Sequence, residues 1–295
     1  MTRRAGAAET AGAAGAGRDG RDGQDGRRGE VVVPGPVPRL ELAGWRDRYG
    51  VVAGITVPGD TGFDLGLWTG RPVGQVMGNW RAFLGAEPGF AGHVLGHQVH
   101  GKRVRWHDSI SGWVIQEGVD GHATATPGLM LLVTVADCIP VYLLAPERRA
   151  VALLHAGWRG TAAGILEQGI EMLVESSCCS AAEVVMHCGV GICGGCYEVG
   201  YEVIEAVGGE TVRRSDGRTA RPARLSVGPS DRPKGHLDLR AVLAEQARAL
   251  GLADISTSQY CSGHDRPGFF SHRASAGADG RMVAYLGIPA TPVGR

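Results

Sequence analysis

The chain has 295 residues, 48 of them glycine, and its 30 basic and 30 acidic residues cancel to a formal charge of zero at pH 7. Glycine is roughly twice as frequent as in an average soluble protein, but no Gly-X-Y period runs through the chain and 43 % of its residues are hydrophobic, so it is neither collagen-like nor one long flexible linker. The balanced charge argues against a global field that would hold nucleic acid or an anionic membrane, and no apolar run approaches the ~20 residues that span a bilayer.

The first residues differ in composition from the rest of the chain. Repeated Arg-Asp-Gly units and alanine dominate residues 1–29, and such a segment buries too little apolar surface to offset the entropy lost on ordering. We therefore predict a disordered tail over residues 1–35 and a single catalytic domain over residues 36–295. The seven cysteines are an odd number, and no signal-peptide core is recognisable, so we expect a cytoplasmic protein with free thiols.

Apolar periodicity predicts most of the secondary structure in this domain. Alternating or continuous apolar segments indicate strands, and apolar residues at intervals of three and four indicate helices. Strands are expected over residues 51–57, in two short pieces within 94–106 broken at Gly101, and over 129–135, 141–145, 150–155, 183–188 and 281–286. Helices are expected over residues 73–84, 162–174, 198–207 and 237–250. Residues 209–236, rich in Arg, Gly and Pro, are expected to form a basic surface insertion.

Three apolar segments end in side chains that can bind a metal ion. The first ends in Gln98-Val99-His100-Gly101, the second in Ala136-Asp137-Cys138, and the third in His155. A hairpin that turns at residues 146–149 pairs His155 with Pro140, which places Cys138 two positions along the same edge, within ~7–8 Å at the backbone. His100 would have to arrive from another strand.

One cysteine and two histidines suit Zn²⁺, and three protein ligands leave the fourth tetrahedral position open, which favours catalysis over a structural role. The same residues also fit a metal-free hydrolase in which His155 or His100 activates a Cys138 nucleophile. They also fit ordinary buried side chains. Asp137 is expected to orient its loop, or to orient a metal ligand by a hydrogen bond without binding the metal itself.

A second group of cysteines is harder to interpret. Cys193-x-x-Cys196 could be a redox pair or half of a zinc knuckle, but Cys178 and Cys179 are adjacent and do not supply a second pair of the same spacing. We therefore predict a structural or incidental role for Cys193 and Cys196. Cys261 and His264, close together in sequence, could approach the candidate site.

The motifs together resemble the core signature of the YfiH/laccase-domain family. The resemblance rests on residues 98–101, on Asp120-Gly121-His122-Ala123-Thr124 leading to residues 136–141, and on residues 155–160. It continues through residues 189–200, 237–239 and 261–273, so that it spans most of residues 50–288. Members of this family were first described as multicopper polyphenol oxidases and are now regarded as purine nucleoside phosphorylases. The resemblance implies an α+β fold in which mixed β-sheets are sandwiched by helices.

The resemblance also implies a site and a chemistry. It implies a zinc site, with copper as the alternative ion, whose ligands and catalytic residues are His100, Cys138 and His155. The implied activities are phosphorolysis of adenosine, inosine and S-methyl-5′-thioadenosine, and deamination of adenosine. Phosphorolysis needs a cation for the attacking phosphate, for which Arg159 and Arg273 are candidates, and Gln98 is a further substrate candidate.

The expected partners are a nucleoside and phosphate, without nucleic acid or membrane, and we expect a monomer. One departure from the family pattern concerns phosphate, since the usual Phe-Ser-Tyr-Arg-Arg appears here as residues 270–274, with His272 in place of Tyr and Ala274 in place of the second Arg. The alternative functions are a copper-dependent polyphenol oxidase, a metal-free Cys/His hydrolase and a non-catalytic binding protein. A copper cluster would favour His-x-His pairs, and none of the ten histidines forms one.

Overall fold

The computed structural model of the chain describes residues 29–208, 212–213, 219–220 and 234–290. The predicted tail up to residue 28, and most of the predicted insertion at 209–236, lie outside the described residues. The assignment of residues 30–33 to the tail is wrong, because they form strand β1 (Glu30–Val33), which runs antiparallel to β2 (Arg39–Leu42). Three successive valines favour an extended chain. The carboxylate of Glu30 accepts a hydrogen bond from the hydroxyl of Ser258 at 2.5 Å, which ties β1 to the rest of the molecule.

Two large mixed sheets form the centre of the fold. Within the described ranges, one sheet has the strand order β1-β2-β3-β17-β8-β4-β6 and the other the order β16-β11-β9-β10-β7-β5. The remaining strands of the first sheet are β3 (Val52–Thr56), β4 (Gly92–His97), β6 (Gly112–Glu117), β8 (Leu129–Val135) and β17 (Met282–Ile288). The second sheet consists of β5 (Val104–Trp106), β7 (Gly121–Thr124), β9 (Ile139–Ala145), β10 (Ala150–Ala156), β11 (Val185–Cys188) and β16 (Asp254–Thr257). Two short pairs join β12 (Glu198–Gly200) to β15 (Lys234–His236), and β13 (Val212–Arg213) to β14 (Thr219–Ala220).

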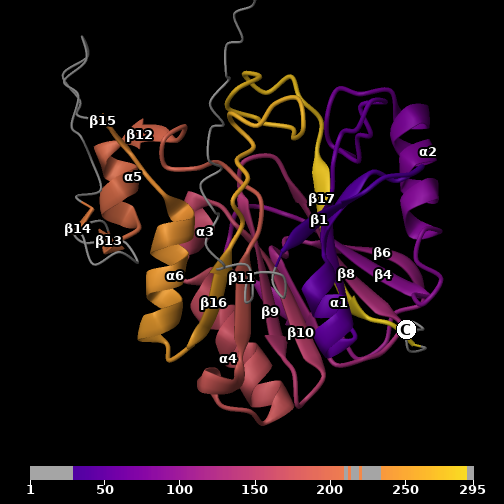
Figure 1. The fold of residues 1–295 in the computed structure, drawn as a ribbon, viewed down its shortest axis with the longest axis horizontal. Helices are drawn as coiled ribbons and strands as arrows, with labels where there is room; N and C mark the ends of the chain where they lie inside the picture. Colours follow the sequence, from indigo (N-terminus) through magenta and orange to yellow (C-terminus); the bar gives the residue numbers. More distant parts are fainter. Residues whose placement is uncertain (1–28, 209–211, 214–218, 221–233, 291–295) are drawn as a thin grey trace, which may run out of the picture.

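The described helices are α1 (Ala43–Tyr49), α2 (Val73–Leu84), α3 (Trp158–Ala163), α4 (Ile165–Ser177), α5 (Tyr201–Ala206) and α6 (Leu239–Ala249), with a short 3₁₀ turn at Ala181–Glu183. Helices α2, α4 and α6 cover outer faces of the sheets, whereas α1 packs its Trp45 into the apolar cluster between them. Helix α2 lies on one side of the molecule, and α4 and α6 lie on the opposite side (Figure 1). No helix in the described part of the chain is long and apolar enough to cross a membrane.

Three apolar clusters pack the sheets and helices against one another. One cluster fills the space between the sheets and includes Leu131 of β8 and Val151 of β10. A second joins α2, through Trp80, to the outer face of the first sheet. A third joins α4 and α6 to the outer face of the second sheet. Every residue of β9 and β10 is buried, because both faces of these strands are covered, and this is why they appear in the sequence as continuous apolar segments. The predicted α+β fold of mixed sheets between helices is confirmed.

Most of the predicted elements are present, with differences where distant contacts intervene. Strand β8 has the predicted bounds, and the β9–β10 hairpin pairs His155 with Pro140 as predicted. The helix predicted over 162–174 is two helices, because Gly164 adopts a left-handed φ of 88° that ends α3. The helix predicted over 198–207 begins instead with β12, which pairs with β15 at the far end of the predicted insertion.

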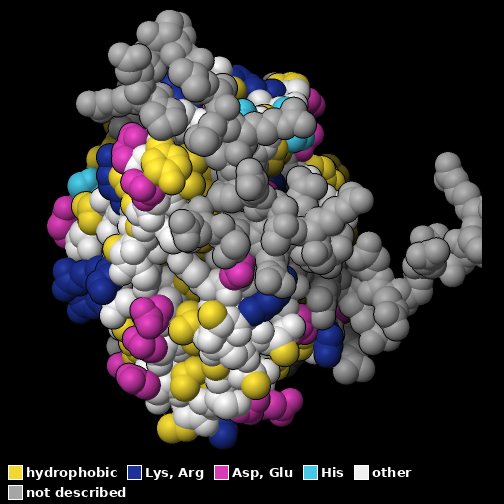
Figure 2. Space-filling model, turned by 90° about the vertical axis from the view of Figure 1, so that its left-hand side faces the viewer, with side chains coloured by type: hydrophobic (Ala, Val, Ile, Leu, Met, Phe, Trp, Pro, Cys, Tyr) yellow, Lys and Arg dark blue, Asp and Glu magenta, His cyan; other side chains and the backbone are white. Residues whose placement is uncertain are grey.

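The described surface carries both signs of charge side by side. Figure 2 shows basic and acidic side chains scattered among apolar and uncharged ones on the face that includes the α5 and α6 side of the molecule. Neither sign forms a continuous area on the described part of that face. This distribution agrees with the balanced charge of the sequence.

Candidate active site

Three segments from both large sheets converge on one cavity. His100 follows β4 of the first sheet, Cys138 lies in the link from β8 to β9 that joins the two sheets, and His155 is in β10 of the second sheet. The potential ligand atoms of the three side chains lie within 4.8 Å of one another. The two imidazole rings meet edge to face with their centroids 4.9 Å apart. The structure thus brings together the three residues that the strand ends indicated, and we call them the triad.

The backbone around the triad is unusual. His100 and Asp137 have φ values of 59° and 86°, in the left-handed region that side chains other than glycine seldom adopt. The turn at Asp137 redirects the chain from one sheet to the other and presents Cys138 to the cavity. Gly157 allows close approach, since a Cβ atom there would lie 3.0 Å from the sulfur of Cys138 and 3.2 Å from the ring of His100.

A fully buried carboxylate, Asp120, holds two members of the triad in place. Its oxygens accept the backbone N–H groups of Val99, His100 and Gly101 at 2.9 to 3.1 Å. Its Oδ1 lies 3.0 Å from Nδ1 of His155, which leaves Nε2 of that ring for the centre of the triad. Burial opposes ionisation of Asp120, but the hydrogen bonds from His155 and the backbone outweigh burial and lower the pKa of the carboxyl.

The charges of Cys138 and His155 depend on each other. Burial disfavours the thiolate of Cys138, but the charge of His155 and hydrogen bonds from both imidazoles outweigh it and lower the pKa of Cys138 to about 6. Burial likewise disfavours the imidazolium of His155, but the Cys138 thiolate and Asp120 outweigh it and raise the pKa of His155 to about 9. Near neutral pH the pair is therefore a thiolate beside an imidazolium. The thiolate is the form of cysteine that binds metals and attacks electrophiles.

The triad opens into a cavity of about 440 Å³, within the size range of sites for small organic ligands. Two exposed arginines line this cavity, and each lies over an aromatic ring. The guanidinium of Arg159 is 4.4 Å from the ring of Trp158, and that of Arg273 is 5.1 Å from the ring of Tyr197. These contacts hold both cations at the cavity wall, where an anionic group of a ligand would meet them.

An aromatic pair forms another part of the cavity wall. Trp68 stacks on His97 with ring centroids 4.5 Å apart, and the indole remains 51 % exposed. The imidazole is held from behind by the carboxylate of Glu117, whose oxygens lie 2.7 and 2.9 Å from Nδ1. A large, flat and exposed aromatic surface in a cavity suits stacking by a planar ligand. Trp68 was not among the predicted site residues, because its only signal in the sequence is a tryptophan in a Gly-rich segment.

Gln98 lines the cavity, but most of its amide is used within the protein. Nε2 donates to the carbonyl oxygen of Thr134 at 2.8 Å, and Oε1 accepts the backbone N–H and the hydroxyl of the same residue at 2.7 and 2.8 Å. These bonds join the end of β4 to the end of β8. One amide N–H of Gln98 remains for a ligand.

Asp137 anchors the loop at residues 271–273, which carries the cavity residues His272 and Arg273. Its Oδ1 accepts the hydroxyls of Ser262 and Ser271 at 2.6 and 2.7 Å, and its Oδ2 accepts the backbone N–H of Arg273 at 2.7 Å. Asp137 was expected to orient its own loop or a metal ligand, and its carboxylate contacts two other segments, at Ser262 and at residues 271–273. Asp120, by contrast, entered the sequence analysis only as part of a motif, because its partners are backbone groups that the folded chain alone brings near.

The chain is similar to several known proteins. A family model described as multi-copper polyphenol oxidoreductase laccase matches residues 46–289. A Deinococcus radiodurans protein named purine nucleoside phosphorylase is 35 % identical over 225 residues, which cover 74 % of this chain and 78 % of that protein. A protein of an unknown prokaryotic organism, named adenosine deaminase RL5, is 34 % identical over 174 residues, or 58 % of this chain and 62 % of that protein.

The fold has a counterpart among solved structures. The crystal structure of YlmD from Geobacillus stearothermophilus superposes with a TM-score of 0.74 and 28 % sequence identity, over 88 % of this chain and 99 % of that chain. The family match covers the second large sheet, the first large sheet apart from β1 and β2, the triad and the cavity residues described above. The chain therefore belongs to the multi-copper polyphenol oxidoreductase laccase family, the YfiH/laccase-domain family that its motifs resemble.

Proposed function

We propose that the chain is a zinc-dependent purine nucleoside phosphorylase whose active site is the triad and its cavity. The observation that carries this proposal is the combination in one cavity of a Cys/His/His donor set, the two exposed guanidinium groups of Arg159 and Arg273, and the exposed indole of Trp68. The names of the related proteins, purine nucleoside phosphorylase and adenosine deaminase, support a purine nucleoside as substrate.

The donor set fits a metal ion. His155 is held in one orientation by Asp120, Cys138 is ionised near neutral pH, and His100 completes a set of three. Zinc accepts such a set and keeps a fourth position open for a ligand. When bound there, the ion supplies a Lewis acid that polarises a substrate oxygen.

The same donor set also occurs in blue-copper centres, which add a weak axial ligand such as methionine or glutamine. None of the cavity residues that the structure describes is a methionine. The glutamine at this cavity, Gln98, has its oxygen engaged twice by Thr134. These two observations favour zinc over an electron-transferring copper.

The chain's own residues account for substrate placement. We assign the purine to the face of Trp68 and the phosphate to Arg159 and Arg273, so that the ribose spans the space beside the triad. In phosphorolysis a phosphate oxygen forms a bond to C1′ of the ribose while the bond from C1′ to the purine nitrogen breaks. The electron pair goes to that nitrogen, which is then protonated, and we assign the proton to His272 on the cavity wall. The two guanidiniums keep the attacking anion in place while positive charge develops on the sugar.

The test combines product analysis with substitutions in the triad. Inosine and adenosine are incubated with the purified protein, with and without phosphate, and the products are separated by chromatography. We expect base and ribose 1-phosphate only when phosphate is present, and a loss of at least ~100-fold in His100→Ala, Cys138→Ala and His155→Ala, because each removes one ligand of the donor set. Cys178→Ala, which removes an exposed thiol at the end of α4, is the matched control and keeps full activity.

Three outcomes would overturn the proposal. Ammonia released from adenosine without phosphate, and no base with it, would assign the site to deamination. Oxidation of phenols that depends on copper would assign it to the oxidoreductase chemistry in the family description. Full turnover in any of the three alanine variants would remove the triad from the mechanism.

A further inference from the structure

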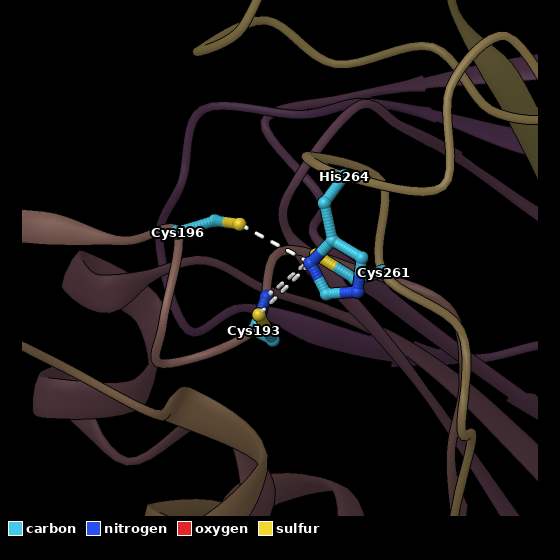
Figure 3. Close-up of side chains that lie close together, drawn as sticks. All are labelled: Cys193, Cys196, Cys261 and His264. Carbon is cyan, nitrogen blue, oxygen red and sulfur yellow. Dashed lines mark hydrogen bonds between the residues drawn. The ribbon is translucent and has the colours of Figure 1, made fainter.

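A second cluster of metal-binding side chains lies outside the triad. Cys193 and Cys196 come from the loop between β11 and β12, and Cys261 and His264 come from the loop after β16 (Figure 3). Their three sulfurs and one ring nitrogen lie within 4.8 Å of one another. The adjacent Cys178 and Cys179 do not supply a second pair of equal spacing, but Cys261-x-x-His264 does, with one histidine in place of a cysteine.

The fold brings the two loops together through the backbone. Gly191 and Cys261 form an isolated parallel bridge, and the N–H of Ser262 donates to the carbonyl of Gly191 at 3.1 Å. This bridge continues the parallel pairing of β11 with β16 beyond the ends of both strands. The two x-x spacings therefore face each other because the strands before them are neighbours in the second sheet.

The separations match those around a tetrahedral ion. Nδ1 of His264 lies 3.3 Å from the sulfur of Cys196 and 3.6 Å from that of Cys193. Bonds of 2.3 Å to sulfur and 2.0–2.1 Å to nitrogen at a tetrahedral angle place nitrogen and sulfur about 3.6 Å apart. One ring nitrogen carries either a single proton or a single lone pair, so two thiols that contact it must share one weakened, three-centre hydrogen bond. A cation between them would satisfy both sulfurs and the nitrogen.

Backbone N–H groups stabilise negative charge on the sulfur of Cys261, and a carboxylate lies beside the imidazole of His264. The sulfur of Cys261 accepts the backbone N–H groups of Cys193 and Gly263, both at 3.3 Å. Asp265 accepts the N–H of Cys261 at 2.7 Å, and its other oxygen lies 3.8 Å from Nε2 of His264. A carboxylate near the outer nitrogen of a ligand histidine is a common support for bound zinc.

We propose that Cys193, Cys196, Cys261 and His264 bind one zinc ion in a closed, structural site. Four protein ligands leave no position for a substrate, in contrast to the three of the triad. The ion would link two loops that build the cavity, since Ile192 and Tyr197, which flank the two cysteines of the first loop, line the cavity wall. On the second loop, Ser262 donates to Asp137 beside the triad.

The test is the zinc content of the purified chain, measured by elemental analysis for matched single variants. We expect two zinc ions per chain in the unmodified protein, loss of one in Cys196→Ser and His264→Ala, and no loss in Cys178→Ser. His264→Ala is included because its side chain is 57 % exposed and its removal leaves the core intact. Zinc content in Cys196→Ser and His264→Ala equal to that of Cys178→Ser would overturn the proposal.

A second measurement separates this site from the triad. The zinc of the Cys138→Ala variant, in which the triad is disabled, is replaced by cobalt. The absorption spectrum of the cobalt form is then recorded. We expect thiolate-to-cobalt charge transfer and the bands of tetrahedral cobalt, both absent when His264→Ala is added. If the triad holds no metal, Cys138→Ala leaves the zinc content unchanged while Cys196→Ser still lowers it, so the two proposals fail separately. A disulfide between two of the three cysteines in freshly purified, metal-free protein would overturn the structural zinc site.

Discussion

Two buried carboxylates, Asp120 and Asp137, fix the position of different segments around the triad by hydrogen bonds. Asp120 fixes the loop of His100 and the ring of His155, and Asp137 fixes the loop that presents Arg273. Both are 8 % exposed or less, so their hydrogen bonds are protected from water. The three side chains of the triad were predictable as candidate ligands because cysteine and histidine at strand ends stand out in a sequence. The carboxylates were harder to predict because their partners are mainly backbone N–H and hydroxyl groups of distant segments.

The ionised thiol leads to a test of reactivity against pH in the metal-free protein. Because the pKa of Cys138 is lowered to about 6, we expect its rate of alkylation by iodoacetamide to rise through about pH 6. The rate is followed by peptide mass spectrometry after treatment with a chelator. In His155→Gln the favourable charge is removed, so the rise should move to higher pH. An unmodified protein whose Cys138 reacts only above about pH 8.5, as ordinary thiols do, would contradict the ion pair.

The same pair should add almost no pH dependence to the free energy of unfolding between about pH 6.5 and 9. The lowered pKa of Cys138 gives stability that is present above pH 9 and is lost as the pH falls through about 6. The raised pKa of His155 gives stability that is complete below pH 6.5 and is lost as the pH rises through about 9. Between these limits the two slopes have opposite sign and largely offset each other. The pH dependence of Cys138 alkylation therefore reveals the ion pair, whereas the pH dependence of the free energy of unfolding does not.

Helix α3 lies against the loop that follows His100 of the triad, and the contact is made by the one glycine of this helix, Gly160. A Cβ atom on Gly160 would lie 2.7 Å from the carbonyl oxygen of Gly101, which follows His100. Gly160→Ala should therefore push α3 away from that loop, with an overpacking cost of about 1–3 kcal/mol. We expect a lower metal content and lower activity in a chain that still folds, as judged by circular dichroism and elemental analysis.

The matched control lies in another helix. A Cβ atom on Gly78, in the middle of α2, meets no atom within 4 Å. Gly78→Ala should raise the free energy of unfolding by about 0.5–1 kcal/mol, because alanine is the better helix former, and leave activity unchanged. Equal activity in the two variants would show that α3 does not position the triad.

At the level of elements, local pairings were predictable and distant ones were not. The β9–β10 hairpin follows from one turn and two apolar segments, and its register was correct. Strand β1 and the pairing of β12 with β15 depend on partners that the local pattern does not identify. Apolar periodicity also continues across Gly164, although the backbone there ends one helix and begins another.

At the scale of the whole molecule, two tyrosines allow a comparison of the contacts that hold the sheets together. Tyr142 of the second sheet donates its hydroxyl to the carbonyl of Gly54 in the first sheet at 2.8 Å. Tyr285 is equally buried, but its hydroxyl has no hydrogen-bond partner among the described residues. Tyr142→Phe should lower the free energy of unfolding by about 1–2 kcal/mol, measured by denaturant titration.

Tyr285→Phe serves as the control for this substitution. It removes a hydroxyl that is buried without a partner, so the stability should stay within about 0.5 kcal/mol of the unmodified protein or increase. If both variants lost the same free energy of unfolding, the hydrogen bond from Tyr142 to Gly54 would make no net contribution to stability.

The position of β17 has a consequence for the order in which a nascent chain can become active. This strand follows all the other described strands along the chain, yet it lies between β3 and β8 in the first sheet. Until it has left the ribosome, β8 has no neighbour on that side, and Cys138 comes directly after β8 at the entry to the second sheet. A chain whose synthesis stops early therefore lacks the support that aligns its triad. On the function proposed above, catalysis begins only after translation has passed the last of the central strands.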